Sequence, residues 1–218
     1  MKLFKKNTTP LSKTDEQKED KKEYWSNDGY GKSHAFTNFI ERPTSFYATI
    51  FNEILSKLDK NAKIMEIGCS VGGNLNYMYE MGFTNVEGVD INKSAIDFGS
   101  NHFPSLSGKL FCGDAIKFVE NLPTNEYDLI FTVGCLQNIP YRDKQIFSEI
   151  VRVSKKYILA KEPVSLSGDG SGIHSNWDYL EAFASCGTSR IIEKVIPNNL
   201  WGEKPEGEKV PVLMVFVK

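Results

Sequence analysis

Hydrophobic and polar positions along this chain alternate between two periods. Short apolar runs, which predict buried strands, lie at 63–67, 86–89, 127–133 and 157–160. Between these runs apolar residues recur at spacings of three and four, which predicts amphipathic helices. Alternation of apolar strands with such helices indicates right-handed crossovers and a mostly parallel sheet covered on both faces.

The predicted helices begin and end at residues with suitable conformational preferences. Pro43 is favourable at a first helical position, and the apolar face from Tyr47 to Leu58 predicts a helix leading into the first strand. Further helices are expected over 73–82, 93–102, 116–121, 142–154 and 175–186. Strands over 190–196 and 210–217 are expected to form an antiparallel pair.

The first strand runs directly into a glycine-rich turn and then a helix. In an open parallel sheet such a turn lies at the carboxyl end of a strand, and its glycines let the backbone approach a small molecule. Twenty-two residues after Gly68 the second apolar run ends at Asp90, where a Rossmann-type unit places the carboxylate that binds a ribose. The pattern predicts an adenosine-containing cofactor.

The glycine spacing separates two classes of cofactor. The dinucleotide fingerprint is G-x-G-x-x-G, whereas this chain has Ser70 at the second position and then Gly72 and Gly73. This pattern disfavours nicotinamide and flavin cofactors. Glu66, Gly68 and Gly72 instead resemble motif I of the class I S-adenosylmethionine-dependent methyltransferases, in which a glycine usually stands at the position of Ser70.

Later segments resemble the same family in the expected order. The run at 110–115 resembles the third strand with its terminal acid, and 127–140 resembles the fourth strand and the loop lining the methyl-transfer site, with Asn138 in place of a histidine. The resemblance covers roughly residues 60 to 218. It implies a Rossmann-like, doubly wound sheet of seven strands with helices on both faces, mostly parallel, with an antiparallel last strand inserted between the fifth and sixth.

The resemblance also implies S-adenosylmethionine as the cofactor and a set of residues that bind it. Asp90 would accept hydrogen bonds from the ribose hydroxyls, and Asp114 with Ala115 would contact the adenine. Asp114 could instead merely cap the following helix, a role worth about 1 kcal/mol. Likewise, the glycines could serve only the tight turn. The expected cofactor-binding residues are Glu66, Gly68, Cys69, Ser70, Gly72, Asn74, Asp90, Ile91, Asp114, Ala115, Val133 and Gly134.

The acceptor side carries fewer sequence features. Methyl transfer requires in-line attack and, where needed, removal of the acceptor proton. His174 follows a glycine-rich loop after the fifth strand and is the expected catalytic base, unless it is an exposed or capping histidine. Tyr30, Asn138 and Trp177 are expected to line a pocket for a polar acceptor, and His34 would reach it only beneath a closed lid.

Composition narrows the class of protein further. The 218 residues, 40% hydrophobic and 25% charged, fit one soluble domain, and a net charge of -2 provides no positive field for nucleic acid or an anionic membrane. Four dispersed cysteines favour a reducing cytoplasm, and no apolar run approaches the roughly 20 residues of a membrane span. No cluster of histidine, cysteine and carboxylate predicts a metal.

These patterns predict a charged flexible tail over 1–23, an aromatic lid and helix over 24–59, and a cofactor-binding core over 60–218. The segment from Trp25 to Arg42 resembles methylases of bacterial sugar biosynthesis, although its aromatics could simply cover the sheet. Arg42 could pair with a carboxylate of cofactor or acceptor, or be solvated. We therefore expect methylation of an oxygen or nitrogen on a small metabolite, such as a sugar derivative. The alternatives are a non-catalytic cofactor-binding partner protein and a nicotinamide-dependent oxidoreductase.

Overall fold

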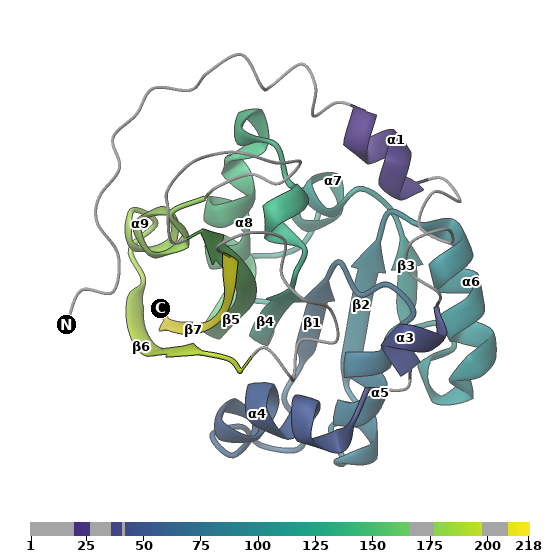
Figure 1. The fold of residues 1–218 in the computed structure, drawn as a ribbon. Helices are drawn as coiled ribbons and strands as arrows, with labels where there is room; N and C mark the ends of the chain where they lie inside the picture. Colours follow the sequence, from purple (N-terminus) through teal and green to yellow (C-terminus); the bar gives the residue numbers. More distant parts are fainter. Residues whose placement is uncertain (1–19, 27–35, 41, 166–176, 198–208) are drawn as a thin grey trace.

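The strands form one sheet in the order β3-β2-β1-β4-β5-β7-β6 (Figure 1). The structure is a computed structural model, which describes residues 20–26, 36–40, 42–165, 177–197 and 209–218. The strands are β1 (Ile64–Ile67), β2 (Val86–Asp90), β3 (Leu110–Cys112), β4 (Tyr127–Val133), β5 (Ser154–Ser165), β6 (Ser189–Val195) and β7 (Lys209–Val217).

The strand order reverses at the centre of the sheet, between β1 and β4. β1 pairs in parallel with both β2 and β4, so that Glu66 lies opposite Gly88 on one side and Phe131 on the other. β7 lies between β5 and β6 and is antiparallel to both. The predicted topology is confirmed, including the inserted last strand. The reversal creates a crevice at the carboxyl ends of β1 and β4, where open α/β sheets bind ligands.

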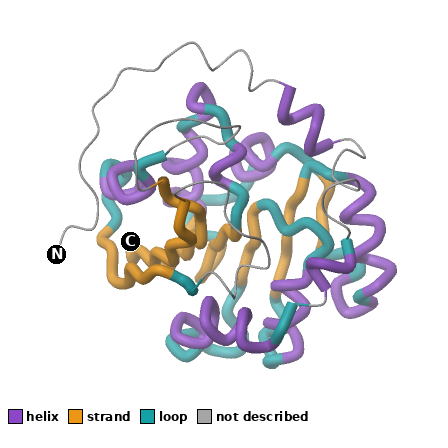
Figure 2. The backbone as a smooth tube through the Cα atoms, viewed as in Figure 1, coloured by secondary structure: helices purple, strands orange, loops and turns teal. Residues whose placement is uncertain are grey.

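Helices cover both faces of this sheet (Figure 2). The helices of the described residues are α1 (Asp20–Ser26), α3 (Thr37–Ile40), α4 (Thr44–Leu55), α5 (Gly73–Glu80), α6 (Lys93–His102), α7 (Ala115–Glu120), α8 (Gln145–Val153) and α9 (Tyr179–Ala184), of which α4 to α9 pack on the sheet. Short 3-10 turns are η2 (Pro104–Leu106), η3 (Leu136–Asn138) and η4 (Tyr141–Asp143).

The hydrophobic core is divided by the sheet into two clusters. Residues of α4, α5 and α6, including Phe51, Leu75 and Ile96, pack on one face. Residues of α7, α8 and α9, including Ile116, Phe147 and Phe183, pack on the other. Alternate residues of each central strand point into opposite clusters, as the two-residue period of a strand requires. The face to which a charged strand residue points therefore decides which helices it meets.

Several elements differ at their ends from the sequence-based predictions. Pro43 directly precedes α4 instead of occupying its first position. β5 begins before the predicted 157–160 and continues to Ser165, because β7 pairs with it as far as that residue. The helix predicted over 142–154 is divided into η4 and α8. None of the helices within the described ranges is long and apolar enough to cross a membrane.

Candidate active site

The turn between β1 and α5 is built from three residues with left-handed backbone geometry. Gly68, Ser70 and Gly72 have φ values of 75°, 50° and 80°. A non-glycine residue in this region costs roughly 1–2 kcal/mol. Ser70 nevertheless adopts the conformation that a glycine would take at the middle position of motif I. The departure from the family pattern leaves this left-handed conformation in place.

The glycines of this turn also permit close internal packing. A Cβ added at Gly68 would lie 2.4 Å from the Sγ of Cys135, in the loop after β4. One added at Gly72 would lie 3.0 Å from a methyl carbon of Leu106. The lack of a side chain at Gly68 therefore brings the loops after β1 and β4 together, on either side of the crevice.

Asp90 connects this turn to the end of β2. One carboxylate oxygen accepts a hydrogen bond from the amide of Ser70 at 2.8 Å, and the other accepts from the amide of Asn92 at 2.9 Å. Burial raises the pKa of Asp90, although these backbone hydrogen bonds oppose the shift. Each carboxylate oxygen has a second lone pair, so both can also accept a ribose hydroxyl. Ile91 follows directly, at the position predicted to contact the cofactor.

A buried polar pair lies beside the same turn. The side-chain amide of Asn74, in α5, donates to Glu66 Oε1 at 2.6 Å. Burial raises the pKa of Glu66 well above its ordinary value, and its Oε2 and the Oδ1 of Asn74 have no hydrogen-bond partner among the described residues. Two buried acceptors suit a cationic donor, and the α-ammonium of the methionine part of S-adenosylmethionine is such a group. The residues present therefore fit this cofactor.

Asp114 caps α7, as the alternative interpretation of the sequence expected. Its Oδ1 accepts from the amides of Ile116 and Lys117 at 3.0 and 3.2 Å. Its Oδ2 lies 2.8 Å from the ammonium of Lys22. Burial opposes ionisation of Asp114, but Lys22 and the helix amides outweigh it and lower the pKa. The contact with adenine stays a prediction, for which Ala115 lies at the first position of α7.

Helix α1 is attached to the carboxyl end of the sheet at several points. Lys22 also contacts Asp143 Oδ2 at 3.1 Å, in η4 after β4. The side chain of Asn92 donates to the backbone oxygen of Trp25 at 2.9 Å. Figure 1 shows α1 close to α7, beyond the helices that pack on the sheet. Because these contacts come from the loops after β2, β3 and β4, α1 bridges the edge at which the cofactor is expected.

The loop after β4 is held by one buried carboxyl group, Glu162 of β5. Its oxygens accept hydrogen bonds from the Thr132 hydroxyl at 2.9 Å and from three successive backbone amides at 3.1 to 3.3 Å. These amides belong to Cys135, Leu136 and Gln137. Burial raises the pKa of Glu162 to about 7, against the effect of these hydrogen bonds. Glu162 therefore fixes the path of the loop that begins at Val133 and Gly134.

Two of the three predicted acceptor-binding residues meet at this loop. Asn138 donates from its side chain to the oxygen of Gly134 at 3.2 Å. The indole nitrogen of Trp177 donates to the oxygen of Ile139 at 3.1 Å. The structure therefore brings Asn138 and Trp177 to one loop, where binding of an acceptor stays a prediction. Tyr30, His34 and His174 lie outside the described residues.

β5 carries a second buried charged residue, Lys161, which sequence reasoning missed. Lys161 is only 3% exposed, and burial together with the nearby Arg42 lowers its pKa well below the ordinary value. Arg42 lies over the ring of Phe46 at 4.6 Å from its centroid, and Lys161 lies 5.4 Å from the same centroid. The sequence signal was the pair Lys161 and Glu162, directly after an apolar run.

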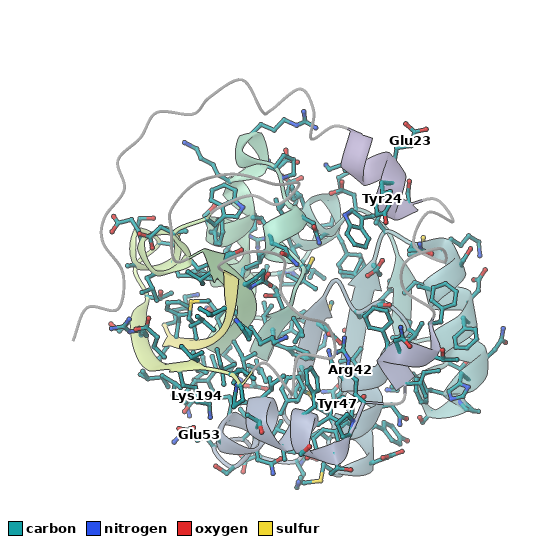
Figure 3. The ribbon with its side chains drawn as sticks, in the orientation of Figure 1. Glu23, Tyr24, Arg42, Tyr47, Glu53 and Lys194 are labelled. Carbon is teal, nitrogen blue, oxygen red and sulfur yellow. The ribbon has the colours of Figure 1, made fainter. Side chains whose placement is uncertain are left out.

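Two cavities lie on the described part of the molecule, one beside Arg42 and one beside Asp114. One of about 290 Å³ lies between α4 and α5 and is lined by Arg42, Tyr47 and Gly73 among others, with Arg42 and Tyr47 close together in Figure 3. Another of about 410 Å³ is lined by residues around Asp114 and Lys117. Within the described part of the chain, no three side chains of metal-binding type form a group that could hold an ion.

A sheet with a central reversal, a glycine turn after β1 and a carboxylate at the end of β2 define a Rossmann-like nucleoside-binding protein. Residues 64–157 match the family model of the methyltransferase domain. This stretch, a little under half of the chain, therefore has the features of a class I methyltransferase domain, and S-adenosylmethionine is its cofactor.

Solved structures share this fold at low sequence identity. Magnesium protoporphyrin IX methyltransferase of Synechocystis PCC 6803, with bound S-adenosylmethionine, gives a TM-score of 0.67 at 11% identity, covering 98% of this chain and 100% of that one. Geranyl diphosphate C-methyltransferase of Streptomyces coelicolor A3(2) gives 0.67 at 14% identity, covering 96% and 99%. The cyclase SpnF gives 0.62 at 16% identity, covering 80% of each.

A curated relative, sterol 24-C-methyltransferase of Yarrowia lipolytica, is 23% identical over 137 residues. The alignment covers 58% of this chain but only 35% of that protein. The chain thus matches about a third of the length of this relative.

Proposed function

We propose that the protein transfers a methyl group from S-adenosylmethionine to an oxygen or nitrogen of a small metabolite, such as a sugar derivative. The observation that carries the proposal is the buried pair Glu66 and Asn74, whose two remaining acceptor atoms adjoin a turn held by Asp90. S-adenosylmethionine supplies the electrophilic methyl group when bound. Net charge and the lack of a spanning helix in the described ranges support a cytoplasmic enzyme without a nucleic-acid partner.

In this proposal, some residues of the site bind the cofactor and others position the acceptor. Asp90 accepts the ribose hydroxyls, and Glu66 with Asn74 receives the ammonium group. The loop from Val133 to Asn138, fixed by Glu162, positions the acceptor for in-line attack, which is the main contribution a protein makes to this reaction. His174 accepts the acceptor proton where one must be removed. In this proposal residues 24–59 form the lid and helix, and 60–218 the core.

Two other functions use the same fold. A non-catalytic partner protein would bind S-adenosylmethionine without turnover, and the likeness to a cyclase illustrates that this fold does not determine the reaction. One type of nicotinamide oxidoreductase uses a paired tyrosine and lysine with the spacing Tyr-x-x-x-Lys. Tyr157 and Lys161 have the Tyr-x-x-x-Lys spacing but lie on a strand, which separates them by roughly 13 Å. They cannot act together on one substrate atom.

The test is calorimetric titration with S-adenosylmethionine, S-adenosylhomocysteine and the nicotinamide dinucleotides. We expect micromolar binding of the two sulfur nucleosides, which Asp90→Ala weakens and Asp97→Ala, an exposed control in α6, leaves unchanged. Tighter binding of a dinucleotide would overturn the proposal. Transfer of a tritiated methyl group to a panel of hydroxyl and amine acceptors then separates an enzyme from a binding partner.

A further inference from the structure

The carboxyl group of Glu162 is enclosed beside the loop that follows β4. Glu162 is fully buried, and Thr132, which donates its hydroxyl to it from β4, is buried as well. One hydroxyl and three amides thus converge on its two oxygens. Hydrogen bonds to an ionised carboxylate are roughly twice as strong as those to a neutral acceptor. Glu162 is therefore able to hold this loop firmly.

The neighbouring charge on β5 serves the other face of the sheet. Tyr157 and Leu159 precede Lys161 at two-residue spacing and belong to the core cluster that also contains Phe46. The ammonium of Lys161 lies 5.4 Å from the centroid of the Phe46 ring, and it attracts Glu162 only through space. The direct contacts of Glu162 are hydrogen bonds, which are directional, so they determine where their donors lie.

The three amides belong to the start of the 3-10 turn η3. Cys135 directly precedes this turn, and Leu136 and Gln137 are its first two residues. Amides at the start of a helical turn have no acceptor within it. Glu162 takes the place of a capping side chain, although it comes from a strand 24 or more positions further along the chain. The start of η3 is thus attached to β5.

Cys135 connects this attachment to the glycine turn after β1. Its amide donates to Glu162 at 3.1 Å. Its side chain fills the space beside Gly68, where an added Cβ would lie 2.4 Å from Sγ and 2.5 Å from the Cβ of Cys135. Groups packed this closely cannot move independently. A displacement of Cys135 therefore reaches the turn.

The turn passes this constraint on to the carboxylate at the end of β2. The amide of Gly68 donates to the oxygen of Val89 at 2.8 Å, and the amide of Ser70 donates to Asp90 at 2.8 Å. A continuous series of contacts thus runs from Glu162 across the crevice to the carboxylate proposed to bind the ribose. It joins the loop on the acceptor side to the loop on the cofactor side.

We propose that Glu162 is a positioning residue for the cofactor as well as for the acceptor, because its hold on Cys135 fixes the glycine turn through Gly68. The inference rests on the proposed function, because it concerns the same cofactor site. Glu162 acts through these two residues and not on the reacting atoms. Its removal should consequently loosen a turn with which it forms no hydrogen bond.

The first test measures hydrogen exchange of single backbone amides by NMR, in the whole chain without any ligand. Glutamine has one acceptor oxygen where glutamate has two, so in Glu162→Gln at least one donor loses its partner. We expect the turn amides of Ser70 and Gly72 to exchange about threefold faster or more, relative to amides of the central strands. Faster exchange that is confined to residues 135–137 overturns the inference.

A second variant keeps the test valid if Glu162→Gln does not fold. Cys135→Ala removes the sulfur beside Gly68 but keeps the backbone amide that donates to Glu162. It should loosen the turn in the same way, and unchanged exchange of the turn in this variant refutes the inference. Ile54→Val is the matched control, because Ile54 is buried near the end of α4, in the cluster on the other face. It lowers stability without loosening the turn relative to the strands.

Calorimetry with S-adenosylhomocysteine measures the consequence for the site. Glu162→Gln and Cys135→Ala should each weaken binding by about three- to tenfold, whereas Ile54→Val should leave it unchanged. Because both substitutions act through one contact, the double variant should weaken binding by less than the product of the two single effects. A double variant that equals this product overturns the inference, since a merely structural role of each residue predicts independent effects.

The outcomes separate this inference from the proposed function. If S-adenosylhomocysteine binds equally to the wild type and to both single variants, Glu162 does not position the cofactor, and the cofactor assignment stands. If S-adenosylhomocysteine does not bind the wild type, the proposed function fails. Hydrogen exchange of the ligand-free protein then still tests the link between Glu162 and Gly68.

Discussion

The backbone amide of Ser70, in the turn after β1, donates a hydrogen bond to the carboxylate of Asp90, at the end of the adjacent strand β2, at 2.8 Å. Asp90 therefore shapes the glycine turn as well as offering oxygens to a ribose. We expect Asp90→Asn to lower the free energy of unfolding by about 1–3 kcal/mol. We also expect it to weaken the binding of S-adenosylhomocysteine by about tenfold or more. Denaturant unfolding and calorimetry measure the two effects. Asp97→Asn, on the exposed side of α6, should change neither, and unchanged stability in Asp90→Asn would contradict this account.

Ser70 carries a conformational cost that a glycine would remove. Its φ of 50° lies in the left-handed region, where a Cβ is disfavoured by roughly 1–2 kcal/mol. Replacement by glycine would remove this cost. Part of the gain would be offset, because glycine loses more conformational freedom on folding than serine does. We expect Ser70→Gly to raise the free energy of unfolding by about 0.5–1 kcal/mol and Ser70→Val to lower it. Chemical denaturation of both variants provides the check, and equal destabilisation by both would refute the prediction.

Glu162 predicts a pH dependence of stability. Its pKa in the folded protein is about 7, whereas an unfolded glutamate titrates near 4.3. The folded state therefore holds the proton more tightly, and the stabilisation present below pH 4.3 is lost as the pH rises through 7. This contribution amounts to roughly 4 kcal/mol. The difference in free energy of unfolding between the wild type and Glu162→Gln should decrease as the pH rises from 5 to 8. A difference that does not change with pH would contradict the raised pKa of Glu162.

Glu66 predicts proton release when the cofactor binds. Burial raises its pKa, and an ammonium group beside it would favour the ionised form. The affinity for S-adenosylhomocysteine should therefore increase with pH between the bound and free pKa values of Glu66. Calorimetry in two buffers of different ionisation enthalpy measures the released proton. Glu66→Gln should abolish the release, Glu80→Gln on the exposed side of α5 should keep it, and release from Glu66→Gln would exclude Glu66 as its source.

The ion pairs of Lys22 predict that salt weakens the attachment of α1 to the site. Its side chain is 39% exposed, so its pairs with Asp114 and Asp143 contribute less than about 1 kcal/mol each. If α1 covers the bound cofactor, Lys22→Ala should speed dissociation of S-adenosylhomocysteine by about two- to fivefold at low salt, and less at 1 M salt. Glu23→Ala is the control on the same helix (Figure 3). Equal dissociation rates of S-adenosylhomocysteine from the two variants, measured by stopped flow, would contradict a role of Lys22 in keeping α1 over the bound cofactor.

Much of the fold follows from short-range patterns in the sequence. The helix predicted over 93–102 coincides with α6, because a capping residue and a following proline mark both ends. The glycine turn and Asp90 were expected at one edge of the sheet and are hydrogen-bonded there. The cofactor assignment from the glycine spacing is confirmed, while the role of each cofactor-binding residue stays a prediction.

The charged residues of the acceptor side could not be placed from the sequence, because long-range contacts determine them. The apolar run at 157–160 marks only part of β5, and pairing with β7 carries the strand on through Lys161 and Glu162. Lys22 lies in a segment without apolar periodicity, and its partners Asp114 and Asp143 are more than 90 positions away. No local pattern connects such residues.

The opposite orientation of Lys161 and Glu162 also protects the alignment of the sheet. A slip of β5 by one residue would turn every side chain to the other face. The ammonium would then enter the apolar layer beneath α8, and the carboxylate would replace it over Phe46. Each displaced charge would lose its hydrogen bonds or its aromatic contact, at a cost of several kcal/mol. These two charges therefore make β5 resistant to mispairing during folding. This role is independent of any part they have in a reaction.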